Sequence, residues 1–546
     1  MSRLEIASPK RAKIVMEGLY KDLERRIESS PPGLCPVDMA RAFLELCHAQ
    51  TCGKCVPCRI GLGQLNNFIR EVLDGKATMK TLDIMEQTAL SIMESADCAI
   101  GYEAANMVYK GLIGYRDDYV EHIQNGRCTC TYNQPVPCVS LCPAHVDIPG
   151  YVALVGEGRY ADAIRLLRKD NPFPTTCGFI CEHPCEARCR RNMVDDSINI
   201  RGLKRVAADF AGEVDPPQCA PDTGKKIAIL GGGPGGLSAA YYLQLMGHQT
   251  TVYEMLPKLG GMLRYGIPNY RLPKDRLDDD IRAILKTGVQ VKNGLKIGQD
   301  ITIQQLRQEY DVVLITIGAS TDKKLGLENE DADGILSAVQ FLRNVGKNQI
   351  MDLTGKEVAV IGGGNVSMDA VRTAKRLGAK KVSIVYRRRV ADMTALPGEI
   401  DGAVAEGIEL QTLKAPASID VDENHHVKGI YVTPQMVSSI RDGRASIKPT
   451  GEEDIYIPCD VLIVAIGQNI ETHHFEQAGI PVERGKIVTK STGAFENLPG
   501  VFAGGDCASG PASVIKAIAA AYFHVFALRR TINGKQSRII QKMTIL

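Results

Sequence analysis

The sequence predicts an α/β protein in which two parallel-sheet domains follow two helical, cysteine-rich segments. Three observations support this class. From about residue 225 onward, short β-branched runs alternate with Ala-rich helical stretches, which is typical of buried parallel strands. A strand–glycine turn–helix pattern occurs twice, about 130 residues apart, so two similar domains are expected. Fourteen of the 17 cysteines fall between Cys35 and Cys189, where the pattern is helical.

Length and composition limit the class of protein. At 546 residues the chain has room for three or four domains, and its 44% apolar and 23% charged residues are ordinary for a globular protein. A net charge of +2 gives no reason to expect nucleic acid or an anionic membrane as a partner. The first residues lack the apolar run of an export signal, and no stretch of about 18 apolar residues could cross a bilayer. We therefore expect a soluble, cytoplasmic protein with neither partner.

Changes in composition predict the order of the segments. Residues 1–33 have the pattern of a charged helical extension, and residues 34–125 and 126–222 are two helical segments, each with a cysteine group. The α/β part follows. Its expected strands are KIAIL (226–230), TTVYE (250–254), VVLITIG (312–318), EVAVIGGG (357–364), KVSIVY (381–386) and VLIVAIG (461–467).

The first glycine motif, Gly231-x-Gly233-x-x-Gly236, stands between a strand and the helix LSAAYYLQLMG. In such a turn the first glycine allows the sharp bend and the second lets the backbone approach a pyrophosphate. The third allows close packing of helix on strand. The next strand ends in Glu254, at the spacing expected for an acidic residue that holds a ribose. A dinucleotide site is favoured over a glycine turn without a ligand.

The second motif is Gly362-x-Gly364-x-x-Ser367, followed by the helix MDAVRTAKRLG. Its next strand ends in three arginines, Arg387 to Arg389, and carries no carboxylate there. Because arginine can grip a 2′-phosphate that an acidic residue would repel, the pattern favours NADPH over NADH. A solvated basic face is the alternative interpretation.

The cysteines indicate metal, since their clustering does not fit the disulfide framework of a small secreted protein. The spacing Cys52-x-x-Cys55-x-x-Cys58 with a remote Cys98 is more typical of an iron–sulfur cluster than of zinc, although four cysteines can bind either. Eight more cysteines lie between residues 128 and 189. The three late cysteines, with Cys35 and Cys47, fit buried free thiols.

Three stretches give the α/β part a clear resemblance: YEMLPKLGGMLRYGIPNYRLPK (253–274), the second motif VIGGGNVSMDA, and GVFAGGDCASGPASVIKAIAAA (500–521). Together they resemble the small subunit of glutamate synthase and its relatives, over about residues 126–546. The resemblance implies two Rossmann-like domains, an FAD domain of residues 223–327 and 471–546 with an inserted NADP domain of residues 328–470. It implies these cofactor contacts: Gly231, Gly233, Pro234, Gly235, Gly236, Glu254, Gly260, Gly261, Arg264, Gly362, Gly364, Asn365, Val366, Ser367, Arg387, Arg388, Gly467, Gly505 and Asp506. Asp506 would face the ribityl chain of the flavin.

The same family carries two [4Fe–4S] clusters before its FAD domain, and PCVSLCPAHVDIPGYV and CGFICEHPCEARC match its two cysteine segments. By the family's interleaved pattern, one cluster would take Cys128, Cys130, Cys138 and Cys189. The other would take Cys142, Cys181 and Cys185. Its fourth ligand is often Glu or Gln, but Lys204 stands at that point here, so Cys177 is the substitute candidate.

The stretches TCGKCVPCRIG and ADCAIG resemble the C-terminal cluster domain of the NADH-binding, FMN-carrying subunit of complex I and of bifurcating hydrogenases. This implies a third [4Fe–4S] cluster on Cys52, Cys55, Cys58 and Cys98, without the FMN domain that usually accompanies it. A cluster domain fused to such a flavoprotein is similar to the flavoprotein subunit of Stn-type electron-bifurcating transhydrogenases.

That resemblance implies an oxidoreductase that passes hydride between NADP(H) and FAD and electrons through the clusters to partner subunits. The expected partners are an FMN-carrying, complex-I- or hydrogenase-like subunit and a small ferredoxin-like subunit, with NAD and ferredoxin served by the complex. The alternative is the NADPH electron-input subunit of a glutamate-synthase-type enzyme, which would not need residues 34–125. A thioredoxin-reductase-type enzyme needs a CxxC motif in residues 328–470, and that range contains only Cys459.

The expected chemistry belongs to the cofactors, so no side chain is predicted to act as an acid, a base or a nucleophile. One side chain, Glu399 in the family-like segment MTALPGEI, is a candidate contact for the nicotinamide.

Overall fold

The computed structural model describes residue 12 and residues 14–21, 35–125, 136–441, 444–490 and 492–521. Close contacts divide the chain into two compact units. The described parts of Met1–Ile148 and His183–Ile200 belong to the first unit, and those of Pro149–Glu182 and Arg201–Gln536 belong to the second. Of the predicted N-terminal extension, residues 14–21 are helical and most of the remainder lies outside the described residues. The predicted domain boundaries stay a prediction.

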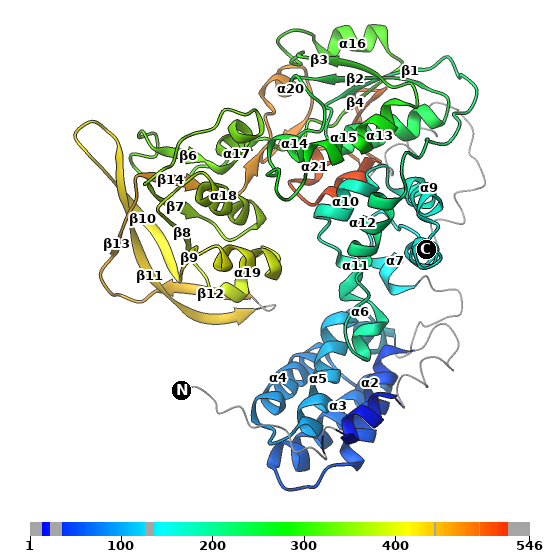
Figure 1. Ribbon diagram of the computed structural model, residues 1–546, viewed down its shortest axis with the longest axis vertical. Helices are drawn as coiled ribbons and strands as arrows, with labels where there is room; N and C mark the ends of the chain where they lie inside the picture. Colours follow the sequence, from blue (N-terminus) through cyan, green and yellow to red (C-terminus); the bar gives the residue numbers. More distant parts are fainter. Residues whose placement is uncertain are drawn as a thin grey trace. The chain divides into compact units, whose positions relative to one another are not determined.

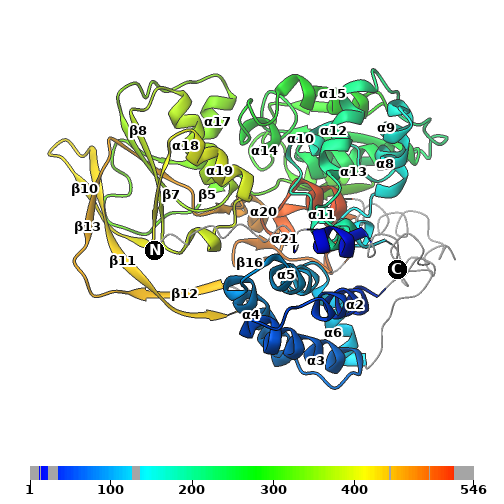
Figure 2. The ribbon, with the colours of Figure 1, turned by 60° about the horizontal axis from the view of Figure 1, so that its bottom comes forward.

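The first unit is helical, as predicted. Its longer helices are α2 (Pro36–Ala49), α3 (Leu62–Leu73), α4 (Met79–Ser95), α5 (Ala99–Gly114) and α6 (Arg116–Asn125). Shorter pieces are the π-helical turn η1 (Pro57–Gly61), α7 (Pro137–Leu141), α11 (Pro184–Ala187) and the 3-10 turn η2 (Arg190–Met193). Figure 2 shows α2 to α6 gathered as one bundle.

Apolar side chains at helical spacing form the core of this bundle. On α3, Leu62, Leu65 and Ile69 recur every three or four residues and are fully buried. A capping box closes the start of α4, where Thr78 and Thr81 exchange side-chain and backbone hydrogen bonds. The cysteine loop of residues 52–58 is therefore attached to a packed bundle with its own core.

The second unit begins with helices and continues as two parallel sheets. The helices are α8 (Ile148–Gly156), α9 (Tyr160–Asp170), α10 (Pro174–Ile180) and α12 (Ile200–Phe210). A Cβ atom on Gly178 would lie 2.9 Å from the Cα of Arg205, so α10 and α12 approach each other at backbone distance. Asp280 is fully buried and accepts hydrogen bonds from the backbone N–H groups of Thr175 (3.2 Å) and Thr176 (2.7 Å). This carboxylate joins the first turn of α10 to the helix of the first sheet that carries it.

The first sheet has the strand order β18-β4-β1-β2-β3, and every pair is parallel. Its strands are β1 (Lys226–Leu230), β2 (Gln249–Glu254), β3 (Gln290–Asn293), β4 (Val312–Ile315) and β18 (Val501–Ala503). Helices α13 (Pro234–Leu245) and α15 (Lys274–Leu285) lie on one face, and α16 (Ile303–Glu309) lies on the other (Figure 1). The short helices α14 (Met262–Tyr265), α20 (His473–Gln477) and α21 (Asp506–Ser509) and the small β16–β17 ribbon (Val482–Glu483, Lys486–Ile487) complete this region.

The second sheet has the order β6-β14-β7-β8-β9 and is also parallel throughout. Its strands are β6 (Ile335–Ser337), β7 (Glu357–Ile361), β8 (Lys381–Tyr386), β9 (Glu409–Thr412) and β14 (Val461–Val464). Helices α17 (Ala338–Gly346), α18 (Asn365–Arg376) and α19 (Pro397–Ala405) pack against it, together with the 3-10 turn η3 (Val390–Asp392). These strands and helices confirm the predicted α/β class with two Rossmann-like sheets.

An antiparallel sheet, which the sequence did not predict, covers the other face of the second sheet. It consists of β10 (Lys414–Val421), β11 (Val427–Arg441), β12 (Arg444–Pro449) and β13 (Ile455–Pro458). The strands β10, β12 and β13 each pair with β11. Ile430 and Val432 of β11 are fully buried with Ala359 and Leu462 of the parallel sheet. The segments that join the two parallel sheets run side by side, because β5 (Thr321–Asp322) pairs with β15 (Gln468–Asn469).

Of the helices in the described parts of the chain, none has the length and apolar content that a bilayer crossing requires.

Candidate functional site

The first glycine turn lies at the carboxyl end of β1, where a Cβ atom would not fit. Gly231 has φ +110°, and a Cβ there would lie 2.5 Å from the carbonyl oxygen of Thr316 at the end of β4. A Cβ on Gly236 would lie 2.0 Å from the carbonyl oxygen of Gly231, so α13 packs directly on the turn. Gly261 has φ +52°, and its Cβ would lie 2.8 Å from the Cα of Gly233. The turn therefore has the close backbone approach that a pyrophosphate needs.

Glu254, at the end of β2, lies beside this turn as predicted from its spacing. Its side chain is buried, and its Oε2 accepts the backbone N–H of Gly232 at 2.8 Å, while Oε1 accepts that of Leu256 at 2.8 Å. Burial raises the pKa of Glu254 above its usual value, and these N–H groups partly counter the effect. The carboxylate is thus fixed in the place where a ribose hydroxyl is expected.

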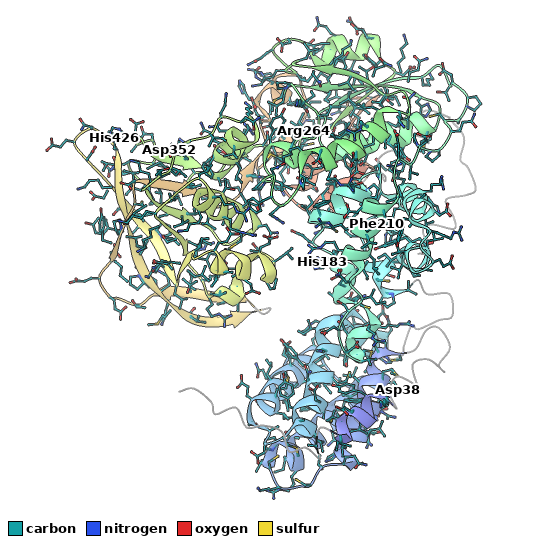
Figure 3. The ribbon with its side chains drawn as sticks, viewed as in Figure 1. Asp38, His183, Phe210, Arg264, Asp352 and His426 are labelled. Atoms are coloured by element: carbon teal, nitrogen blue, oxygen red, sulfur yellow. The ribbon has the colours of Figure 1, made fainter. Side chains whose placement is uncertain are left out.

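Arg264, labelled in Figure 3, is buried on α14. Its Nε donates to the carbonyl oxygen of Leu259 at 2.5 Å, and its Nη2 pairs with Asp278. The Arg264 side chain therefore packs against the Gly260–Gly261 turn and holds it in place. A direct contact of Arg264 with a cofactor stays a prediction.

Asp506 begins α21, directly after β18. Burial raises the pKa of Asp506 to about 6, and its Oδ1 is buried with no hydrogen-bond partner among the described residues. A buried carboxylate oxygen without a partner is costly, so it fits a site in which a bound molecule supplies a hydroxyl. The ribityl chain predicted for this position carries such hydroxyls. Gly505, with φ +72°, has open space around it.

The second glycine turn repeats the first in detail. Gly362 has φ +146°, and a Cβ there would lie 2.4 Å from the carbonyl oxygen of Ala465, just after β14. It would also lie 2.5 Å from Oγ of Ser367, which is fully buried behind the turn. Asn365 begins α18 and accepts the backbone N–H of Leu396 at 2.9 Å. Gly364 and Val366 flank it, and Gly467 (φ +125°) follows β14 at the same sheet edge.

The three arginines after β8 have three different environments. Arg387 is exposed and makes no hydrogen bond or ion pair with a described residue. Arg388 donates from Nε to the carbonyl oxygen of Ala445 at 3.0 Å. Arg389 forms a two-pronged ion pair with Asp392 (2.8 and 2.9 Å) and holds the pKa of that carboxyl well below its usual range. Arg387 is therefore the most accessible cation for a 2′-phosphate, Arg388 keeps its Nη groups for one, and Arg389 has a structural partner. The contacts of Arg387 and Arg388 stay a prediction.

Glu399, in the first turn of α19, is occupied by two arginines. Its Oε1 lies 3.1 Å from Nε of Arg271, and its Oε2 lies 2.8 Å from Nη1 of Arg372. Both oxygens thus have cationic partners on the protein, which the sequence alone did not suggest.

The N-terminal cysteine group meets around the π-helical turn η1. Burial raises the pKa of Cys58 to about 12, and the thiols of Cys55, Cys98 and Cys52 around it add to the shift. Burial also acts on Cys55, but hydrogen bonds from the backbone of Cys58 and Asp97 bring its pKa below the usual value. The four side chains predicted as ligands therefore share one environment, and Cys52 is exposed at its outer edge.

A glycine on α5 supports this environment. A Cβ on Gly101 would lie 2.6 Å from Sγ of Cys58 and 3.0 Å from the Cβ of Ala96. The helix that starts after Cys98 can therefore pass behind the Cys58 thiol only with glycine at this position. Four thiols at short spacing fit a [4Fe–4S] cluster. One of them, that of Cys58, lies on a π-helical turn, a local structure often found at functional sites.

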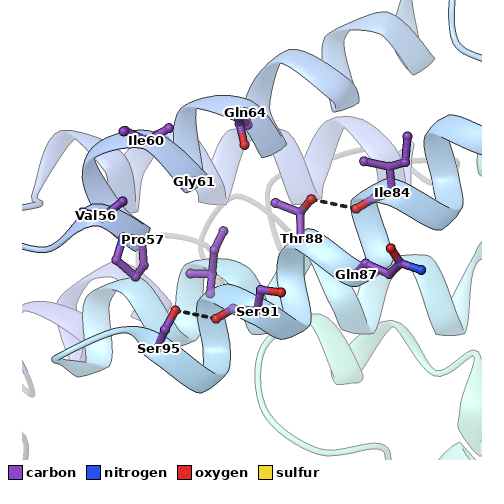
Figure 4. Close-up of a pocket in the computed structure, with 11 residues that line it drawn as sticks. Val56, Pro57, Ile60, Gly61, Gln64, Ile84, Gln87, Thr88, Ser91 and Ser95 are labelled. Carbon is purple, nitrogen blue, oxygen red and sulfur yellow. Dashed lines mark hydrogen bonds between the residues drawn. The ribbon is translucent and has the colours of Figure 1, made fainter.

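A groove of about 610 Å³ opens beside this cysteine loop (Figure 4). Val56, Pro57 and Ile60 line one side, and α4 lines the other with Ile84, Thr88 and Ser91. None of its eleven lining residues is charged, and Val56 and Ile60 are 55% and 50% exposed. The loop between two candidate ligands, Cys55 and Cys58, thus forms part of an open, uncharged surface.

The second cysteine group is distributed over both units. In the first unit, burial raises the pKa of Cys138, and the nearby thiols of Cys189 and Cys142 raise it further. Cys142, Cys185 and Cys189 are buried there. Cys128 and Cys130 lie outside the described residues.

In the second unit, Cys177 is fully buried on α10. Burial raises its pKa, the neighbouring Cys181 raises it further, and Lys204 lowers it. Lys204 is itself buried, with its Nζ 5.9 Å from the ring centre of Tyr151. Cys177 thus lies near Cys181 and Lys204. The ligand set Cys142, Cys181, Cys185 and Cys177 stays a prediction.

Within the described ranges, no three His, Cys, Asp or Glu side chains are gathered closely enough to hold one metal ion. In a [4Fe–4S] cluster each thiolate binds its own iron, so the ligands of the cluster stand farther apart than those of a single ion.

One close pair could not be predicted from the sequence: Sγ of Cys35 lies 3.4 Å from Nε2 of His122. No motif marks this pair, because its members are 87 residues apart.

Three regions of the chain match known protein families. Residues 225–521 match the pyridine nucleotide-disulphide oxidoreductase family. Residues 38–122 match the NADH-ubiquinone oxidoreductase-F iron–sulfur binding region, and residues 114–215 match the 4Fe-4S cluster domain II of dihydropyrimidine dehydrogenase. The first match covers both glycine turns, and the other two cover both cysteine groups.

Individual relatives share much of the chain. The beta subunit of the NADP(+)-dependent formate dehydrogenase of Moorella thermoacetica is 32% identical, over 88% of this chain and 77% of its own length. The beta subunit of the NADPH-Fe(3+) oxidoreductase of Geobacter sulfurreducens is 34% identical, over 90% of this chain and 78% of its own. The small chain of glutamate synthase [NADPH] of Escherichia coli is 34% identical, over 70% of this chain and 85% of its own.

Replacing Gly101 by Ala tests the N-terminal cysteine site. Because the new Cβ would meet Sγ of Cys58 at 2.6 Å, the variant should lose about four irons per chain while its flavin content is unchanged. Iron, sulfide and flavin analysis of anaerobically purified protein measures this. Gly63→Ala on α3 is the matched control, since its Cβ would meet nothing nearer than His48 at 3.9 Å. Full iron content in Gly101→Ala would contradict the site.

Asp506 predicts a pH dependence of FAD binding. A hydroxyl donates best to the ionised carboxylate, so affinity should fall as the pH drops through the Asp506 pKa of about 6, by at most about tenfold per pH unit. Asp506→Asn should weaken binding at pH 7.5 by about 1.5–3 kcal/mol and flatten the profile. Fluorescence titration of flavin-free protein between pH 5.5 and 7.5 measures both, with the exposed Asp222→Asn as control. Parallel profiles for wild type and Asp506→Asn would refute the assignment.

Proposed function

The chain belongs to the pyridine nucleotide-disulphide oxidoreductase family, and from this premise we propose that it is an electron-transfer subunit that connects NADP(H) to partner proteins. It is an NAD(P)H-dependent flavin oxidoreductase with iron–sulfur domains. Residues 225–521 contain only Cys459 and Cys507, so they lack the CxxC pair that disulfide reduction of the thioredoxin-reductase type requires. The two-nucleotide scaffold of the family is thus retained without that chemistry.

One observation carries the proposal: the cysteine site of residues 52–98 lies in a bundle with its own core, beside an open groove. An enzyme that used only its own flavin would not need this second electron site. Electrons cross only short distances between redox centres, so a site with an exposed thiol at its edge favours delivery to another protein.

The residues of the chain then have distinct tasks. Bound FAD would accept hydride as an electron pair, and the clusters would carry electrons singly. The Gly231 turn and Glu254 would hold the first dinucleotide, and Asp506 would accept a hydrogen bond from its ribityl chain. The Gly362 turn would hold the pyrophosphate of the second, and Arg387 would pair with its 2′-phosphate. The protein supplies position and charge, and the proton that the flavin would gain with the hydride would leave to solvent when the electrons pass to the clusters.

We infer further that the complex is an electron-bifurcating transhydrogenase, in which this FAD-and-cluster subunit joins an FMN-carrying, complex-I-like subunit and a small ferredoxin-like subunit. Support comes from residues 38–122, because they match an iron–sulfur binding region of NADH-ubiquinone oxidoreductase. The uncharged groove beside Cys55 offers this partner a surface without a charge barrier.

A second candidate is the NADP-side subunit of a formate dehydrogenase. It is favoured by the likeness to the Moorella thermoacetica protein, which spans 88% of this chain. A glutamate-synthase-type role has less support, because the match to that small chain covers 70% of this chain and such an enzyme has no need for the cysteine site of residues 52–98.

Co-purification separates the candidates. The chain is expressed anaerobically with its genomic neighbours, and the complex is assayed for NADPH-driven reduction of NAD⁺ and ferredoxin, for NADP⁺-dependent formate oxidation, and for glutamate synthesis. The proposal expects the first activity, and iron analysis near twelve per chain with one FAD. Formate oxidation or glutamate synthesis in its place would select the corresponding alternative.

Arg387 should determine the choice between NADPH and NADH. Arg387→Ala should raise KM for NADPH by the equivalent of about 1.5–3 kcal/mol, since a charged hydrogen bond to the 2′-phosphate is lost, and leave KM for NADH nearly unchanged. Steady-state kinetics with a dye acceptor measure both. Arg389→Ala is the matched control and should affect both nucleotides alike, because Arg389 is paired with Asp392. An equal loss for both nucleotides in Arg387→Ala would show a structural arginine.

Cys55 should be required for electron exit. Cys55→Ser should remove one cluster, because a hydroxyl is a far poorer iron ligand than a thiolate, and should abolish reduction of partner acceptors by the complex. Reduction of FAD by NADPH should persist. Cys219→Ser, at a half-buried cysteine outside both groups, serves as control. Normal coupled turnover without that cluster would leave the domain as a docking scaffold only.

A further inference from the structure

A chain of buried and half-buried charges connects the surroundings of the two glycine turns. Nη1 of Arg271 lies 2.9 and 2.8 Å from the two carboxylate oxygens of Asp369, and its Nε lies 3.1 Å from Glu399. Glu399 continues to Arg372 (2.8 Å), and Arg372 to Glu406 (2.8 Å). The side chains of Arg271 and Asp369 are only 10% and 5% exposed.

Three members of this chain of charges lie on segments that continue from the two nucleotide sites. Arg271 lies ten residues after Gly261, whose turn packs against Gly233 of the first glycine turn. Asp369 lies one helical turn after Asn365, on the helix that begins at the second turn. Glu399 lies in the first turn of α19, next to Leu396, whose N–H is bonded to Asn365. The charges therefore tie one turn to the other.

Stability alone is a poor explanation for this arrangement. Burial raises the pKa of Asp369 to about 6, although the Arg271 guanidinium beside it acts in the opposite direction. Buried ion pairs often add little net stability, because desolvation offsets their attraction, and their best-attested role is to fix register. The ring of Tyr270 packs beside these charges, with the guanidinium carbons of Arg376 and Arg372 at 3.8 and 5.0 Å from its centre.

We propose that Arg271, Asp369 and Glu399 form an ionic clamp of positioning residues that holds the second dinucleotide turn at a fixed place relative to the first. The inference rests on the proposed function, since it concerns the transfer between the nucleotides bound at the two turns. The clamp sets the distance and angle between donor and acceptor through charged groups that pair with one another. Transfer at a fixed geometry is sensitive to small shifts, and a misplacement of about 1 Å can cost on the order of 100-fold in rate.

The test is anaerobic stopped-flow reduction of the flavin in the complete holoprotein by NADPH. Arg271→Lys keeps one charge but cannot bridge Asp369 and Glu399 together. The limiting reduction rate should fall between about 10- and 100-fold. The Kd for NADPH should stay within about twofold, because Arg271 pairs with Asp369 and Glu399 and is not among the residues proposed to hold the phosphates. The isotope effect with 4-deuterated NADPH should rise. Reduction by dithionite should be unchanged.

Two further variants keep the result interpretable. Glu399→Gln preserves shape and releases Arg271 from one side only, so it should give a smaller effect of the same kind if Arg271→Lys folds poorly. Arg276→Lys is the matched control on α15, because Arg276 pairs with Asp209 and Asp279 outside the clamp. It should reduce at the wild-type rate.

A wild-type limiting rate in both Arg271→Lys and Glu399→Gln would overturn the clamp, and so would a rise in Kd with an unchanged limiting rate. Failure of the wild-type flavin to accept electrons from NADPH would overturn the proposed function itself, and the clamp with it. That outcome is visible in the wild-type protein before any variant is made.

Discussion

The second unit depends on one constraint: at two points a strand must turn into a helix while its backbone touches the end of the neighbouring strand. Gly231 meets the carbonyl of Thr316 after β4, and Gly362 meets the carbonyl of Ala465 after β14. Neither position has room for a Cβ, and both have positive φ. In each sheet, parallel pairing brings the carboxyl ends of the strands to the same edge. The strand order therefore positions both turns, Glu254 and Asp506. The nucleotide sites are thus consequences of strand order.

Much of this could be predicted from the sequence, because the signals are local. The strands from Lys226, Glu357, Lys381 and Val461 are continuous apolar runs, and the glycine spacing marks the turns that follow two of them. The antiparallel sheet β10–β13 was missed, because its strands alternate only weakly and are defined by pairing with β11. The Arg271–Asp369 contact was missed because it joins residues 98 positions apart. Arg387, Arg388 and Arg389 look alike in the sequence, and only tertiary contacts distinguish them.

The two units illustrate different ways of holding a reactive group. In the nucleotide sites the backbone of the glycine turn lines the site, and side chains such as that of Ser367 are buried behind the turn. In the N-terminal bundle the cysteine side chains point toward one site, and the absence of a Cβ at Gly101 leaves room for the Cys58 thiol. Cysteine spacing therefore predicted the participants of the second kind of site, while the supporting glycine carried no sequence signal of its own. Its importance follows only from the helix that passes behind the thiol.

The paired segments β5 and β15 have an evolutionary consequence. Residues 321–322 enter the second sheet and residues 468–469 leave it, held together by strand pairing and by the Asn469 side chain, which donates to the carbonyl of Asp322 at 2.9 Å. An insertion whose two ends meet imposes no strain on the host sheet, whatever its size. A gene for such a protein can therefore exchange the second sheet as one cassette, by recombination at these two sites, provided that the incoming domain keeps the partners of Arg271, Asp369 and Glu399. The junction is a natural place to graft second-sheet domains between relatives.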